Sequence, residues 1–119
     1  MAYDEFLADR VRQVLKEKKT PYREQKMMGG LCFMVNDKMC IGVDTEKTTG
    51  NARIMARIGE NVYDNALKQK GCSEFNITGK AMKGFVFVSG EGIDTHKDLE
   101  YWVQLCLDFN PMAKASKKK

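Results

Sequence analysis

The spacing of apolar residues changes once in the first half of this chain, and that change limits what the chain can fold into. From Asp4 to about Lys18, apolar side chains recur every three or four residues, as on a helix with one apolar face. Over residues 24–58 the period becomes two, which is typical of strands that rest one face on a core. The sequence therefore predicts helices packed on a sheet.

Three strands are predicted in the second of these regions, at residues 31–35, 39–43 and 54–58. The dipeptide Asn36-Asp37 favours a tight hairpin between the first two strands, because both residue types tolerate positive φ. The polar run 45–51 is expected to form the next turn.

The register of that hairpin follows from where the large apolar groups fall. A three-residue loop would pair Val35 with Met39. It would also place Phe33 opposite Ile41 and gather the large apolar side chains on one face. A two-residue loop would pair Phe33 with Cys40 instead and mix the two faces, so the three-residue register is favoured.

The second half of the chain alternates short elements. Asn61 is a candidate cap for a short helix that ends near Gly71. A weaker extended segment follows at 74–77, and residues 84–88 have the composition of a covered strand. The last helix begins at Thr95, with Asp98 in a capping-box arrangement, and ends at 110–111.

The expected element order is therefore α-β-β-β-α-β-β-α. Hairpin-sized links make the sheet mostly antiparallel, and amphipathic helices need a face to cover, so we expect a two-layer α+β domain. Residues 1–112 are expected to form one domain, and 113–119 a disordered Lys-rich tail.

The distribution of charge argues against a dedicated duplex-DNA reader. The net charge is +4, but four of the 20 basic residues lie among the last six, which leaves 16 basic against 16 acidic residues elsewhere. Apolar runs are far shorter than the roughly 20 residues of a membrane span. The acidic start of the chain also differs from a signal peptide, so a cytoplasmic protein without membrane contact is expected.

Residue types that carry chemistry are few and scattered. The four cysteines form no C-x-x-C pair, and the single histidine, His96, falls in the first turn of the last helix without a nucleophile motif nearby. Cys72 is the thiol expected to be most exposed, and Arg57 is expected to be a charge on the sheet surface. The sequence predicts no catalytic residue, no cofactor and no metal ligand.

Two short segments are candidates for contact with a partner. The first is Met28-Gly29-Gly30, where two glycines before a strand allow either a kink or a bare backbone that a partner strand can approach. The second is the cationic turn at 80–84, in which the candidate residues are Lys80, Met82, Lys83 and Gly84. This turn could meet an acidic partner or remain a solvated loop.

Two sequence blocks carry a resemblance to a known family. They are residues 26–40, KMMGGLCFMVNDKMC, and residues 79–86, GKAMKGFV, at this separation. With the opening helix and the Leu99–Trp102 helix, they resemble the N-terminal domain of the TfoX/Sxy family of bacterial competence regulators over roughly residues 3–109. Met28 and Asp37 depart from the phenylalanine and the Asn-Gly turn that are common in the family.

The resemblance implies a non-enzymatic regulatory or adaptor domain that acts through protein contacts, with the cyclic-AMP receptor protein or RNA polymerase as partner. It also implies a sheet with helices against it, similar to secretion chaperones. Full-length competence regulators of this type carry a second, helical domain, so this chain is expected to be a stand-alone copy of the first domain.

Three alternatives remain open. A nucleic-acid binder would use the basic tail 113–119 and lose affinity steeply with salt. A small-molecule-binding or thiol-based enzyme would show a concave pocket that holds side chains with displaced pKa values. A homodimer is possible if the sheet leaves an unprotected edge.

Overall fold

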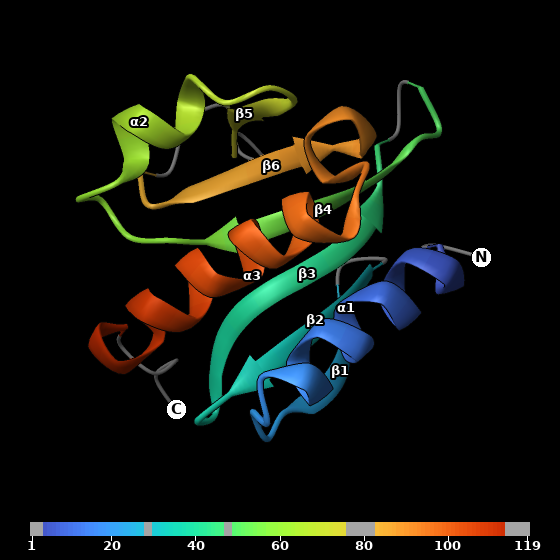
Figure 1. Ribbon diagram of the computed structural model, residues 1–119, viewed down its shortest axis with the longest axis vertical. Helices are drawn as coiled ribbons and strands as arrows, with labels where there is room; N and C mark the ends of the chain where they lie inside the picture. Colours follow the sequence, from blue (N-terminus) through green and yellow to red (C-terminus); the bar gives the residue numbers. More distant parts are fainter. Residues whose placement is uncertain (1–3, 28–29, 47–48, 76–82, 114–119) are drawn as a thin grey trace.

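The computed structural model describes residues 4–27, 30–46, 49–75 and 83–113 (Figure 1). Within these residues the chain forms helices and strands in this order: α1 (Glu5–Glu17), β1 (Arg23–Met27), β2 (Gly30–Val35), β3 (Lys38–Thr45), β4 (Ala52–Arg57), α2 (Tyr63–Leu67), β5 (Cys72–Glu74), β6 (Phe85–Ser89), the 3₁₀ helix η1 (Gly90–Ile93), α3 (His96–Phe109) and the 3₁₀ helix η2 (Asn110–Met112).

One sheet holds the described strands together, in the order β1-β2-β3-β4-β6-β5, with every neighbouring pair antiparallel. Helices α1 and α3 lie side by side across one face of this sheet, which we call the inner face (Figure 1). The opposite face is called the outer face. The predicted α+β fold with helices packed on a mostly antiparallel sheet is confirmed.

The prediction missed strand β1. This strand pairs with β2 along its length, from Arg23 opposite Met34 to Met27 opposite Gly30. Its sequence, REQKM, contains no alternation of apolar and polar residues, because it is an edge strand with exposed polar side chains. The observed order is therefore α-β-β-β-β-α-β-β-α.

The hairpin between β2 and β3 combines parts of both registers. Asn36 and Asp37 both take positive φ, +55° and +62°, and form a two-residue turn, so the predicted three-residue loop is wrong. A bulge after the turn then restores the predicted pairing of Phe33 with Ile41. The bulge turns Ile41 into the core opposite Phe33, whereas an unbroken two-residue register would pair Cys40 with Phe33 and turn Ile41 to the other face of the sheet.

Helix starts follow the capping rules in two cases out of three. The Asp4 carboxylate accepts hydrogen bonds from the backbone N–H groups of Phe6 and Leu7 at the start of α1, and Thr95 forms the predicted capping box with Asp98 at α3. The predicted cap Asn61 is wrong: α2 begins after Val62, with no side-chain cap.

The hydrophobic core lies between the inner face and the two long helices. Alternate residues of the central strands, among them Phe33, Ile41 and Ile54, are fully buried there. The Trp102 indole is buried on α3 and donates its N–H to the Gly92 carbonyl at 3.1 Å. The predicted extended segment 74–77 is shifted, since β5 spans Cys72–Glu74 and residues 76 and 77 lie outside the described part of the chain.

Candidate functional site

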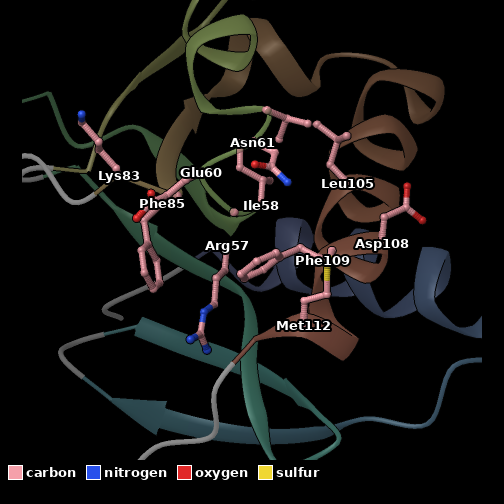
Figure 2. Close-up of a pocket in the computed structure, with 13 residues that line it drawn as sticks. Arg57, Ile58, Glu60, Asn61, Lys83, Phe85, Leu105, Asp108, Phe109 and Met112 are labelled. Carbon is pink, nitrogen blue, oxygen red and sulfur yellow. The ribbon is translucent and has the colours of Figure 1, made fainter.

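A half-open pocket of about 570 Å³ lies where β4 ends (Figure 2). Three segments that are distant in sequence surround it: the end of β4 with the loop that follows, the residues that lead into β6, and the C-terminal turns of α3 with η2. The lining residues are Arg57, Ile58, Gly59, Glu60, Asn61, Val62, Lys83, Gly84, Phe85, Leu105, Asp108, Phe109 and Met112. Six of these thirteen residues carry apolar side chains, and sites that bind organic ligands commonly have an apolar wall of this kind.

Two glycines with positive φ shape the back of the pocket. Gly59 and Gly84 have φ of +87° and +98°, and the Gly84 carbonyl accepts hydrogen bonds from the N–H groups of Ile58 and Gly59 at 2.8 and 3.1 Å. A Cβ atom added to Gly59 would lie 2.4 Å from Cδ1 of Phe109. The bare backbone of Gly59 therefore lets the Phe109 ring pack against the loop.

Arg57 is the cation in the wall of the pocket. Its guanidinium carbon lies 5.3 Å from the ring centre of Phe85 and 6.0 Å from that of Phe109, and Nη1 donates a hydrogen bond to the Met39 carbonyl at 3.4 Å. Figure 2 shows the side chain running between these two rings. Arg57 is half-buried on the outer face, so the expected sheet-surface charge is held in place by aromatic neighbours.

The rim of the pocket carries three more charged groups, all exposed. The side chains of Lys83 and Glu60 have no hydrogen-bond or ion-pair partner among the residues that the structure describes. Asp108 accepts a hydrogen bond from the side-chain amide of Gln104 at 2.8 Å. The pocket therefore combines an apolar interior with a rim of both signs.

The structure brings two of the predicted partner-binding residues to this pocket and separates a third from them. Lys83 and Gly84 line the pocket. Gly30 begins β2 far from it, and a Cβ there would lie 2.6 Å from the Val43 carbonyl oxygen, so this glycine permits close approach of β2 and β3. The remaining predicted residues, Met28, Gly29, Lys80 and Met82, lie outside the described residues.

Three of the four thiols are poorly suited to nucleophilic chemistry. Burial raises the pKa of Cys72 and of Cys32 to about 11, and it raises the pKa of Cys106 well above its usual range. Cys72 is half-exposed, as its position suggested, but only a very small fraction of this thiol is ionised to thiolate at neutral pH. These three cysteines also lie outside the pocket lining.

Other candidate groups are used elsewhere. The exposed His96 ring nitrogen Nε2 lies 2.8 Å from the Glu17 carboxylate, at the opposite end of α3 from the pocket. The buried Tyr63 hydroxyl has no hydrogen-bond partner among the described residues, and its pKa is raised mainly because it is buried. Among the described residues, no three His, Cys, Asp or Glu side chains are grouped to hold a metal ion. Within that same part of the chain, no helix has the length and apolarity to cross a membrane.

Sequence reasoning missed the aromatic part of the site. Phe85 was assigned to a strand and Phe109 to the end of a helix, and neither residue is unusual in such a place. A usable signal exists at Leu105 and Phe109, which are four residues apart and so share a helix face beside the buried stripe of α3.

The fold and the site together define an α+β domain whose helices cover one sheet face and whose pocket lies at the end of a central strand. A scan against protein-family models matches the TfoX N-terminal domain over residues 14–110, whereas a search of curated proteins finds no match. The chain belongs to the TfoX N-terminal domain family. At family level this supports a competence-related regulatory domain.

Proposed function

We propose that this chain is a non-enzymatic regulatory domain that works in the cytoplasm by binding another protein. The observation that carries the proposal is the mouth of the pocket, where apolar side chains are bordered by the side-chain charges of Lys83 and Glu60, which pair with no other group in the part of the chain that the structure describes. Met112 is 66% exposed beside this mouth, and Lys83 and Glu60 stand on its rim. An apolar centre with a polar rim is the usual composition of a protein interface.

One observation favours binding over catalysis. Among the described residues, the side chains with displaced pKa values are Arg12, Cys32, Tyr63, Cys72 and Cys106, and none of them lines the pocket. Catalytic acids, bases and nucleophiles usually gather in a cleft with such displaced values. The regulatory role itself is proposed from family membership, since a fold alone does not define a function.

For the partner we propose the transcription machinery, either RNA polymerase or the cyclic-AMP receptor protein, on the strength of the family resemblance. The test uses the purified chain and each purified partner at physiological salt. We expect saturable binding to one of them and a loss of at least about tenfold in affinity for Lys83→Glu, because the new glutamate would repel an acidic group of the partner that Lys83 attracts.

Lys16→Glu is the matched control. Lys16 is exposed on α1, and its replacement changes the net charge of the chain by the same amount as Lys83→Glu. Equal losses for the two variants would mean that the effect is general electrostatics, and failure of both partners to bind the unaltered chain would contradict the proposed partners. Binding to duplex DNA that weakens steeply with salt and requires residues 113–119 would favour the nucleic-acid alternative.

A further inference from the structure

The pocket has the size and walls of a small-molecule site. Its volume of about 570 Å³ lies inside the range of roughly 300–1,000 Å³ that organic ligands occupy. Ile58, Leu105 and the two phenylalanine rings form the apolar part of its wall. An occupant with an aliphatic or aromatic body would displace water from these side chains, which favours binding in proportion to the apolar area covered.

The polar group best placed for recognition is the Arg57 guanidinium. It is half-buried, it lies between the rings of Phe85 and Phe109, and its hydrogen bond to the Met39 carbonyl fixes its direction. Arginine presents five N–H donors in a planar fork that matches a carboxylate, so it can serve more than one acceptor. Hydrogen bonds between charged groups of this kind are among the stronger polar interactions in proteins.

The pocket also has two acidic residues, and their positions bear on whether the occupant carries a negative or a positive charge. Glu60 and Asp108 are exposed on the rim, and Asp108 already accepts a hydrogen bond from Gln104. Water screens charges on the rim far more than a charge set among aromatic rings. Lys83 adds a second cation at the mouth. The half-buried cation therefore outweighs the exposed acids.

We propose that this pocket binds a small free monocarboxylate with an apolar body, its carboxylate on Arg57 and its body against Phe85, Phe109 and Leu105. This inference goes beyond the proposed function, because it gives the regulatory domain a small-molecule ligand. The two are tested separately: ligand binding is measured on the chain alone, and partner binding in the absence of the ligand.

The first test is a titration of the full chain with linear carboxylates, hexanoate, octanoate and decanoate, each below its micelle-forming concentration. Calorimetry supplies the dissociation constants. Each added methylene is worth about 0.8 kcal/mol when buried, so affinity should rise by up to about fourfold per methylene until the pocket is filled. Absence of saturable binding across the series would overturn the proposal.

Charge on the ligand is tested with decanoate, decanol and decylamine, which share one apolar body. Decanoate should bind at least about tenfold more tightly than the other two, since they lack the carboxylate that Arg57 would hold. Equal binding of decanol would show that the pocket only collects apolar chains. Tighter binding of decylamine would show that the rim acids dominate, and either result overturns the proposal.

Arg57→Gln and Arg53→Gln form a matched pair of variants. Both arginines project from β4 onto the outer face and each lies over a phenylalanine ring, but Arg53 pairs with Asp44 and does not line the pocket. Arg57→Gln should weaken decanoate binding by about 10- to 100-fold, and Arg53→Gln by less than about twofold. Equal effects of the two substitutions would contradict the assignment.

A measurement on the unaltered chain keeps the proposal testable if Arg57→Gln does not fold. Amide resonances of Gly59 and Gly84, which form the back of the pocket, should shift as decanoate is added, while that of Gly50 in the distant β3–β4 turn should not. Shifts confined to residues outside the pocket lining would overturn the proposed site.

Discussion

The inner and outer faces of the sheet come from the same strands but carry different chemistry. On β4, Ile54 points into the core and is fully buried, whereas its neighbour Arg53 lies on the outer face over the Phe87 ring, 3.5 Å from its centre, and pairs with Asp44. The outer face is buried at its centre as well, where Met55 and Phe87 are each 7% exposed. Burial alone therefore does not distinguish the two faces. The inner face is held by close packing of apolar side chains, and the outer face by charged or polarizable groups that lie over aromatic rings.

The largest expected difference between the faces is in stability. Ile54→Ala should lower the free energy of unfolding by about 2–5 kcal/mol, because it leaves a cavity in a close-packed layer. Arg53→Ala should cost only about 1 kcal/mol, since it removes a partly exposed ion pair and one ring contact. Urea denaturation of both variants measures the two values. Equal losses would mean that the outer face contributes as much to stability as the core.

A second prediction compares the pocket with an open turn. Gly59→Ala should cost about 2–4 kcal/mol, because the new Cβ must displace the Phe109 ring and the residue must keep φ of +87°. Gly50 has a similar φ of +76°, but nothing lies within 4 Å of an added Cβ, so Gly50→Ala should cost only about 1–2 kcal/mol. Urea denaturation again supplies the comparison, and equal costs would argue against tight packing at the pocket.

A third prediction concerns Cys72, which packs against the edge of the core from β5. Its pKa of about 11, against an ordinary 9.0, implies that its alkylation by iodoacetamide at pH 8 is about a hundredfold slower than that of a free thiol. Cys72→Ser supplies the background from the buried cysteines. Labelling as fast as that of a free thiol would contradict the effect of burial.

The raised pKa values of the buried thiols also predict how the stability of the fold changes with pH. The unfolded Cys72 and Cys32 thiols lose their protons from about pH 9, whereas the folded ones keep them until about pH 11. The folded state therefore binds more protons than the unfolded state between pH 9 and pH 11. The free energy of unfolding keeps its full value below pH 9 and decreases as the pH rises to 11. Urea midpoints at pH 8 and pH 10.5 measure the decrease.

The smallest expected effect separates two helix starts. Thr95→Ala should lower stability by about 1 kcal/mol, since it removes the side-chain acceptor for the Asp98 N–H in the capping box of α3. Asn61→Ala should change stability by less than about 0.5 kcal/mol, because Asn61 caps no helix. A loss at Asn61 as large as that at Thr95 would show that its amide has a role in the loop beside the pocket.

Most of the fold could be predicted because its signals are local. The apolar stripe of α1, the alternation in β2 and β4, and the capping box at Thr95 each require only a few neighbouring residues. Strand β1 could not be found this way, because an edge strand is stabilised by backbone pairing with β2 and needs no apolar pattern of its own. The bulge at Cys40 was missed for a related reason. It lets the apolar residues of both strands face the core, and this depends on how the two strands pair rather than on a pattern within one strand.

The candidate site was harder to predict from the sequence than the fold. Lys83 and Gly84 were identified through their local pattern, but the aromatic and cationic wall was not, because Arg57, Phe85 and Phe109 come from three separate elements. Their proximity depends on Gly59, which allows a helix end to pack against a loop that begins some 50 residues earlier. A sequence pattern does not show which distant segments come into contact.

Local patterns in the sequence are enough to predict helices on a sheet, an electrically balanced body and no recognisable catalytic motif. Those properties follow from hydrophobic period, capping residues and composition, which act over a few residues at a time. The position of Arg57 between two phenylalanine rings, in the wall of a pocket, could be seen only in the folded chain. The reason is that a pocket is made by contacts between distant segments, and these exist only once the core has fixed the segments in place.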